Sequence, residues 1–152
     1  LFLFIGDGTK RNLVADEVHS GRLPNARLLP WISYDQLADP LASIDVSIVT
    51  LAQGYEHLSI PSKTISALSA GSAILGISRE PSDLASLIDE TACGINFTPD
   101  QVDAIVDWLR SLAHDQSRLR VYQQAARAVA LERFSEARCM RQLTELIADR
   151  LL

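Results

Sequence analysis

Short apolar runs bounded by turn residues alternate along this chain with segments of helical spacing. The apolar runs predict strands at Leu1–Ile5, Ala26–Leu29, Val46–Val49, Ala73–Ile77 and, with the weakest pattern, Gly94–Phe97. The segments between them predict helices at about 10–19, 34–43, 61–70 and 82–90, with Pro40 breaking or restarting the second. Because strands that alternate with helices form parallel sheets covered on both faces, the pattern predicts an α/β fold.

The C-terminal tail is predicted to be all helix. One amphipathic stripe consists of Val102, Ile105, Val106, Leu109, Leu112 and Ala113, and a further helix is predicted at Asp115–Leu131. Ser135 can cap a final helix, whose apolar positions are Ala137, Met140, Leu143, Leu146, Ile147 and Leu151. No internal repeat, low-complexity tract or linker is visible, so residues 1–152 are predicted to form a single domain.

Length and composition fit that prediction. The 152 residues are 47% hydrophobic and 22% charged, as in an ordinary globular domain. No segment approaches the roughly 18 consecutive apolar residues that are needed to cross a bilayer. The chain opens directly on the strand Leu1–Ile5 without a polar lead-in, from which we expect that an upstream part of the protein is missing.

Charge and cysteine usage exclude other classes of function. A net charge of −5 argues against a broad nucleic-acid-binding face, so no nucleic-acid partner is expected. Cys93 and Cys139 lie far apart and lack metal-ligand or redox-motif spacing, which favours a reduced, cytoplasmic chain. His19, His57 and His114 are also separated, with no matched carboxylate or nucleophile beside them. We therefore expect neither a metal site nor a catalytic triad, and no cofactor.

The segment from Glu56 to Gly71 joins two predicted strands through a helix start that suits an anion. Pro61 fits the first helical position, and the free N–H groups of Ser62 and Lys63 would then point out of the carboxyl edge of the sheet. The helix dipole opposes a cation in the first turn by roughly 0.3 to 1 kcal/mol, so Lys63 makes sense if a phosphate lies in front of it. The sequence predicts a diphosphate site here; the simpler alternative is a solvated lysine.

Glu56 could accept hydrogen bonds from sugar hydroxyls, although loop carboxylates are often merely solvated. Gly6-Asp7-Gly8 closes the first strand, and its glycines could let a ligand approach the backbone. The dinucleotide fingerprint fails there because Arg11 stands where a third glycine is needed, so a simple tight turn is the alternative. Trp31 follows the second strand and could stack on a base or serve as a packing anchor.

Several motifs occur together in one order along the chain. They are the strand ending in Gly6-Asp7-Gly8, the strand start Asp45-Val46, the block Glu56–Gly71 with its Ile60-Pro61-Ser62-Lys63 core, Gly94–Pro99 and Glu132–Ser135. Together they resemble the C-terminal lobe of family 4 glycosyltransferases of two-lobed GT-B architecture, over nearly the whole chain. The Ile-Pro-Ser-Lys variant is similar to enzymes of bacterial surface polysaccharide assembly. The resemblance implies a Rossmann-like parallel sheet with helices on both faces.

The resemblance also implies roles for individual residues. In such enzymes this lobe holds a nucleotide-diphosphate sugar, and the cleft between the lobes admits the acceptor. Glu56 falls on the glutamate that contacts the donor-sugar hydroxyls, and Ser62 with Lys63 falls beside the diphosphate. Glu56 and Lys63 are therefore the expected catalytic residues. The expected donor-binding residues are Gly6, Gly8, Trp31, Ile32, His57, Ser62 and Ser66, with Trp31 and Ile32 in the loop near the base.

The chain departs from the family pattern at three positions. Ser66 stands where the family has a second glutamate that grips the ribose hydroxyls, and a serine cannot accept two hydroxyls as a carboxylate does, so ribose recognition is weakened or moved. His57 and Ser59 replace small glycines, which narrows the sugar pocket. The Arg and Lys pair that family members carry on the strand before this chain's first residue is absent, as is the acceptor lobe.

The sequence thus predicts the donor-binding lobe of a retaining, metal-independent glycosyltransferase that acts on a cell-envelope or exopolysaccharide acceptor. The expected partners are a nucleotide-diphosphate sugar, a sugar or lipid-linked acceptor and the missing N-terminal lobe, through which the cytoplasmic protein would contact the inner membrane face. Two rivals are a noncatalytic nucleotide-sugar-binding or interaction module, which Ser66 favours, and a GT-B-like nucleotide-sugar epimerase.

Overall fold

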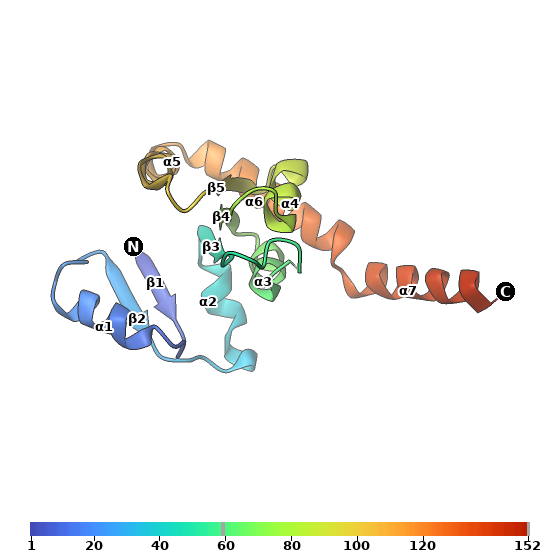
Figure 1. Ribbon diagram of the computed structural model, residues 1–152, viewed down its shortest axis with the longest axis horizontal. Coiled ribbons are helices and arrows are strands. Elements are labelled where there is room, and N and C mark those ends of the chain that lie inside the picture. Colours follow the sequence, from blue (N-terminus) through green and yellow to red (C-terminus); the bar gives the residue numbers. More distant parts are fainter. Residues whose placement is uncertain (59, 152) are drawn as a thin grey trace. The chain divides into compact units, whose positions relative to one another are not determined.

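The computed structural model describes residues 1–58 and 60–151, with the side chains of Tyr34, Arg150 and Leu151 left out of the description. Contacts divide the chain into two compact units, Leu1–Pro40 and Leu41–Leu152. Figure 1 labels the helices and strands in chain order.

The first unit is a parallel strand pair with its connecting helix. Strand β1 (Phe2–Ile5) pairs with β2 (Ala26–Leu29) in a register that sets Phe2 opposite Ala26. Helix α1 (Arg11–His19) connects the two strands and lies against β2. A 3-10 turn at Tyr34–Gln36 and the start of helix α2 (Ala38–Ala42) follow.

The second unit is built on a parallel sheet of order β3-β4-β5. Its strands are β3 (Val46–Thr50), β4 (Ala73–Ile77) and β5 (Gly94–Phe97). Helix α3 (Ser62–Ala70) joins β3 to β4, and α4 (Asp83–Thr91) joins β4 to β5. Helices α5 (Val102–His114), α6 (Gln116–Arg133) and α7 (Glu136–Leu151) complete the chain (Figure 1).

Both faces of the β3-β4-β5 sheet are covered by helices. On one face, Ile74 of β4 packs with residues of α3, α4 and the second half of α6, among them Leu68, Leu84 and Val129. On the other face, Leu75 packs with α5 and the start of α6 through Trp108, Leu112 and Leu119. Successive residues of a strand point to opposite faces, so one short strand supplies both cores. The prediction of parallel strands with helices on both faces is confirmed.

The predicted elements match the structure closely, with one informative difference in the second helix. Pro40 neither breaks nor restarts that helix. The interruption falls at Leu37, between the 3-10 turn and α2, and Pro40 lies inside the first turn of α2. A proline is tolerated there because amide groups of the first turn have no helical acceptor to lose.

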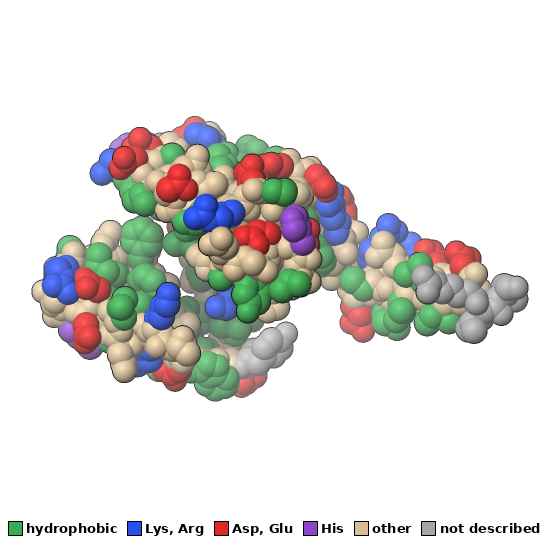
Figure 2. All heavy atoms as spheres, viewed as in Figure 1, with side chains coloured by type: hydrophobic (Ala, Val, Ile, Leu, Met, Phe, Trp, Pro, Cys, Tyr) green, Lys and Arg blue, Asp and Glu red, His purple; other side chains and the backbone are tan. Residues whose placement is uncertain are grey.

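Helix α7 is amphipathic and exposed. Its apolar positions Met140, Leu143, Leu146 and Ile147 are each at least half exposed, and Figure 2 shows apolar side chains gathered along one side of this helix. This exposure is what the sequence pattern predicts for a helix whose apolar stripe has no partner in its own lobe. Among the described residues, no helix has the length and apolarity that a membrane crossing requires.

We predict that Gly94→Ala destabilises the protein by about 1–3 kcal/mol through overpacking. A Cβ atom at position 94 would lie only 1.8 Å from the carbonyl oxygen of Ile74 on the neighbouring strand. Equilibrium unfolding in urea measures the change. Gln124→Ala, at an exposed position of α6, serves as the control and should stay within about 0.5 kcal/mol of the wild type. Equal stability of Gly94→Ala and the wild type would contradict the close approach.

Candidate functional site

Helix α3 begins one residue later than predicted, and its first two amides are those of Ser62 and Lys63, to which the sequence analysis assigned an anion. Pro61 is the N-cap residue, with φ −56° and ψ 136°, so the first helical residue is Ser62 and not Pro61. The Pro61 carbonyl accepts a 2.8 Å hydrogen bond from the Thr64 amide. The amides of Ser62 and Lys63 come before the first helical hydrogen bond, so they are available to a ligand at the positive end of the helix dipole.

Lys63 is the second residue of α3 and is exposed. Within the described part of the chain it makes no ion pair. Its charge therefore faces both solvent and the unfavourable end of the helix dipole, without a carboxylate that would compensate it. An anion placed before this helix would interact favourably with Lys63 and with the dipole.

Thr64 follows Ser62 and Lys63 at the candidate anion site, and sequence reasoning did not single it out. Its side chain is fully buried in the first turn of α3, and its hydroxyl has no hydrogen-bond partner in the described part of the chain. Buried polar groups are normally paired, so an orphaned hydroxyl next to a candidate anion site is notable. The signal in the sequence was a third polar residue directly after Ser62 and Lys63.

Glu56 is half-buried and held by its own loop. Its Oε2 atom accepts a 2.7 Å hydrogen bond from the Gly54 amide, while its main-chain carbonyl accepts a 3.0 Å hydrogen bond from the amide of Asp83. Gly54 has a φ of +90°, a conformation that favours glycine. The loop thus fixes one carboxylate oxygen and leaves Oε1 without a hydrogen bond among the described residues. A carboxylate held in this way can accept further hydrogen bonds from a ligand.

Two neighbouring candidate residues, His57 and Ser66, make different contacts. His57 is exposed, and its Nδ1 atom lies 3.5 Å from Oδ1 of Asp83. Ser66 is also exposed, and its hydroxyl donates a 3.4 Å hydrogen bond to the carbonyl of Ser62, one turn earlier in α3. The serine hydroxyl that replaces a carboxylate is therefore turned back onto its own helix. Ser59, which the sequence analysis also named, lies outside the described residues.

The remaining predicted donor-binding residues belong to the first unit. Gly6 directly follows β1 and has a φ of +123°, and added Cβ atoms at Gly6 and Gly8 would meet no atom within 4 Å. The space beside both glycines is thus open, as an approaching ligand requires. Trp31 is 65% exposed, which excludes a role as a buried packing anchor in its own unit, and Ile32 is half-buried.

A buried polar network, which the sequence analysis missed, lies at the carboxyl ends of β4 and β5. The Ser78 hydroxyl is 2.8 Å from the Ser82 hydroxyl and donates a 2.8 Å hydrogen bond to Oδ1 of Asn96. The Ser82 hydroxyl also accepts a hydrogen bond from the Ala85 amide and so caps α4. Every bond in this network is internal to the protein, so it fixes the end of the sheet.

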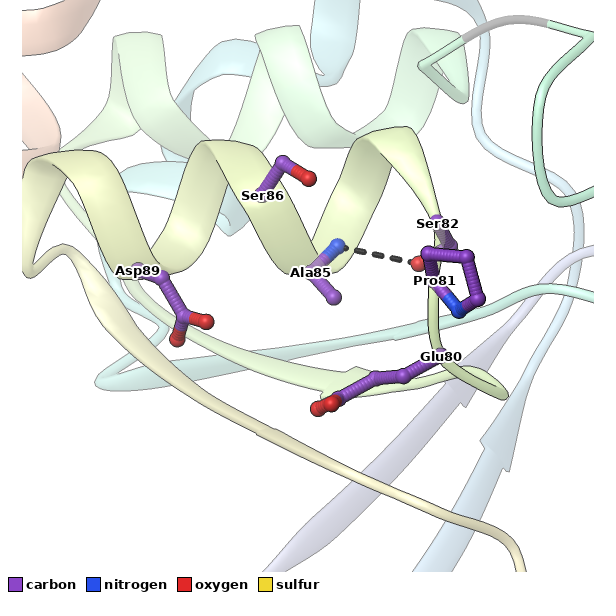
Figure 3. Close-up of a pocket in the computed structure, with 6 residues that line it drawn as sticks. All are labelled: Glu80, Pro81, Ser82, Ala85, Ser86 and Asp89. Atoms are coloured by element: carbon purple, nitrogen blue, oxygen red, sulfur yellow. Dashed lines mark hydrogen bonds between the residues drawn. The ribbon is translucent and has the colours of Figure 1, made fainter.

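An open pocket of about 380 Å³ lies next to this network along α4 (Figure 3). It is lined by Glu80, Pro81, Ser82, Ala85, Ser86 and Asp89. Its charged groups are both carboxylates, which repel a diphosphate. None of the sequence-predicted site residues lines it, so this pocket is not the predicted donor site.

The two cysteines differ in exposure, since Cys93 is buried and Cys139 is exposed. Burial raises the pKa of the Cys93 thiol above its ordinary value, which disfavours the nucleophilic thiolate. In the described part of the chain, no three His, Cys, Asp or Glu side chains come together in a group that could hold a metal ion.

Comparison with known proteins finds similarity to one curated protein and to several solved structures. No family model matches it. The chain is 28% identical over 149 residues to the probable glycosyltransferase WbjE of Pseudomonas aeruginosa, a match that covers 93% of this chain and 37% of WbjE. The chain therefore spans little more than a third of the length of this relative.

The fold is shared with solved glycosyltransferase structures. WaaG, a glycosyltransferase involved in lipopolysaccharide biosynthesis, superposes with a TM-score of 0.68 at 17% identity, over 88% of this chain and 34% of WaaG. HepE of Anabaena in complex with UDP-glucose superposes with a TM-score of 0.75 at 15% identity, over 97% of this chain and 40% of HepE. A second HepE structure, in complex with UDP, gives 0.74 at 16% identity over the same shares. These results confirm the relationship to GT-B glycosyltransferases and the Rossmann-like fold that the motifs predict.

We predict that Lys63→Ala weakens binding of UDP and of UDP-sugars to the full-length protein by roughly 10- to 150-fold and leaves uridine binding nearly unchanged. The change removes a charge-assisted hydrogen bond worth roughly 1.5 to 3 kcal/mol. Titration calorimetry measures all three affinities. Arg120→Ala, which removes an equal charge from an exposed position of α6, should have little effect. Equal UDP affinity of Lys63→Ala and the wild type would remove Lys63 from the diphosphate site.

Proposed function

We propose that this chain is the donor-binding lobe of a retaining, metal-independent glycosyltransferase. In this proposal, the complete enzyme transfers a hexosyl or amino-hexosyl group from a nucleotide-diphosphate sugar to a cell-envelope or exopolysaccharide acceptor. The observation that carries the proposal is the exposed Lys63 in the first turn of α3, which has no ion-pair partner among the described residues and follows a loop that holds the Glu56 carboxylate. The sequence similarity to WbjE and the fold shared with HepE support it.

The proposed chemistry assigns the departing diphosphate to the start of α3. When the bond between the anomeric carbon and the diphosphate breaks, negative charge grows on the diphosphate oxygens. The amides of Ser62 and Lys63, the helix dipole and the Lys63 ammonium group would stabilise that charge. The amides and the helix dipole are fixed before the reaction, so they need not reorganise during it. Such an arrangement can take the place of a metal ion at the leaving group.

The sugar is assigned to Glu56. Its Oε1 atom, which has no hydrogen bond among the described residues, would accept hydrogen bonds from donor-sugar hydroxyls, while the Gly54 amide restrains the carboxylate through Oε2. His57, exposed beside it, would contact the same sugar and narrow the space available to it.

The base and ribose are assigned to weaker features. Trp31 and Ile32 of the first unit stay our proposed contacts for the base, and Gly6 and Gly8, whose backbone is open, stay proposed donor-binding positions. Ser66 donates its hydroxyl back to its own helix, so it would hold a ribose less firmly than a carboxylate would. Because HepE was solved with UDP and with UDP-glucose, uridine nucleotides are the first donors to test.

The proposal includes a second lobe and a location. The chain matches only 37% of WbjE, and an N-terminal acceptor lobe would account for much of the remainder. The exposed apolar stripe of α7 would pack against that lobe. We place the whole enzyme in the cytoplasm, where nucleotide sugars are the donors, with contact to the inner membrane face through the missing lobe. In this proposal residues 1–152 act as a single nucleotide-sugar-binding domain.

The second candidate function is a noncatalytic nucleotide-sugar-binding module, and Ser66 is the observation that favours it. Its hydroxyl cannot grip two ribose hydroxyls, so donor binding could persist without efficient transfer. Assays of the full-length protein with radiolabelled UDP-sugars separate the candidates. Sugar transfer supports the glycosyltransferase, binding alone supports the module, and interconversion of free nucleotide sugars would indicate an epimerase.

We predict that Glu56→Gln reduces sugar transfer by the full-length enzyme at least tenfold and changes UDP affinity by less than about twofold. Glutamine can keep the hydrogen bond from Gly54 but loses charge and acceptor capacity toward the sugar. Initial rates and calorimetry measure the two effects. Glu132→Gln, on the exposed surface of α6, is the matched control. Transfer within about twofold of the wild type would make Glu56 an ordinary surface carboxylate.

We also predict that the chain by itself folds, does not catalyse, and binds nucleotide sugar with a dissociation constant on the order of 1 mM, or about 4 kcal/mol. Transfer needs an acceptor held against the anomeric carbon, and such positioning supplies several kcal/mol of the barrier. Ligand-observed NMR with UDP-, GDP- and ADP-sugars measures the affinity. A micromolar dissociation constant, or sugar transfer without an added N-terminal lobe, would contradict the prediction that donor binding and catalysis need the second lobe.

A further inference from the structure

The segment 52–58, which carries Glu56 and His57, is held to the rest of its unit by very few contacts. Tyr55 and Leu58 are 58% and 69% exposed, so packing anchors the segment weakly. Its internal hydrogen bonds are local: the Tyr55 amide donates to Ala52, the Leu58 amide donates to Tyr55, and the Gly54 amide donates to the Glu56 carboxylate. Such a segment needs a contact from outside to keep a fixed position.

Within the described part of the chain, all hydrogen bonds that join this segment to another element involve one residue, Asp83. The Asp83 amide donates a 3.0 Å hydrogen bond to the main-chain carbonyl of Glu56. The Asp83 carboxylate lies 3.5 Å from Nδ1 of His57. Both members of the Glu56-His57 pair are therefore in contact with the same residue of α4.

The position of Asp83 explains why its amide is available. Asp83 is the first residue of α4, and amides at that position have no acceptor within the helix. The N-cap residue Ser82 uses its hydroxyl to accept from the Ala85 amide and leaves the Asp83 amide free. The buried network of Ser78, Ser82 and Asn96 fixes this end of α4. The Asp83 amide is thus a rigid donor directed at a weakly anchored segment.

We propose that Asp83 is a positioning residue that holds the Glu56-His57 segment in place for recognition of the donor sugar. The predicted effect of Asp83 on catalysis rests on the proposed function. The hydrogen bond from the Asp83 amide to the Glu56 carbonyl supplies most of the restraint. It is shorter than the contact between His57 and Asp83, and Glu56 is less exposed than His57. The contact between His57 and Asp83 is long and both side chains are largely exposed, so its contribution is smaller.

The local geometry permits a substitution that removes the amide donor and keeps the helix. Proline is favoured at the first position of a helix, where its missing N–H is not needed. The residue before a proline must be extended, and Ser82 already has φ −147° and ψ 152°. Asp83→Pro therefore removes both contacts to the segment and keeps the Ser82 cap. Asp83→Ala removes only the carboxylate and keeps the amide, and Asp89→Ala removes a carboxylate elsewhere on α4 as a control.

The first test is hydrogen exchange by mass spectrometry in the full-length protein, read at the peptides covering 52–58. Loss of the main-chain hydrogen bond in Asp83→Pro should speed exchange in this segment by up to roughly tenfold. Asp83→Ala should change it by less than about threefold, and Asp89→Ala should leave it unchanged. Peptides covering the body of α4 should keep wild-type exchange in all variants, which shows that the helix is intact. Unchanged exchange at 52–58 in Asp83→Pro would overturn the proposal.

The second test measures the consequence for the sugar. In Asp83→Pro, kcat/KM for the UDP-sugar should fall by roughly tenfold, while UDP affinity, which depends on α3, should stay within about twofold. A merely structural role would lower both together. Faster exchange with unchanged kcat/KM would overturn the role in sugar recognition. If the wild-type protein transfers no sugar, the proposed function fails, and the exchange test still decides whether Asp83 holds the segment because it needs no substrate.

Discussion

The burial of strand β4 from Ala73 to Gly76 is the constraint on which the second unit depends. Ala73, Ile74 and Leu75 are fully buried, and they alternate between two hydrophobic cores on opposite faces of the sheet. The parallel register of β4 with β3 and β5 places the carboxyl ends of all three strands at one edge. That edge is where α3 and α4 begin, so the packing of β4 decides where the free amides of both helices lie.

The two helix starts at this edge use their free amides differently. At α4, the Ser82 hydroxyl and the Glu56 carbonyl accept from the first-turn amides, so these donors are satisfied within the protein. At α3, the residue before the helix is Pro61, which has no side-chain oxygen to cap it, and Lys63 follows with no ion-pair partner in the described part of the chain. Of the two starts, α3 is therefore the one to which we assign an external anion, while the start of α4 contacts the loop that precedes α3.

The relationship to glycosyltransferases and the geometry of the site contribute different information. The superposition on WaaG and HepE establishes the fold, and the similarity to WbjE supports the proposed class. They do not establish what each side chain does, because sequence identity to the solved structures is 15–17%. Ser66 shows the difference: the shared fold provides the position, but its hydroxyl bonds to its own helix.

The sequence by itself determined the order of the elements, because apolar periodicity and turn residues are local signals. Glu56, Ser62 and Lys63 could be identified as candidates because they lie next to predicted strands. It misjudged Pro61 by one residue, since a proline at the N-cap and at the first helical position leaves the same pattern of letters. Only the tertiary structure decided the contact of Asp83 with Glu56, the network of Ser78, Ser82 and Asn96, and the orphaned hydroxyl of Thr64. These features join residues from separate elements through backbone groups and buried hydroxyls, and no periodicity along the chain records which of them will meet.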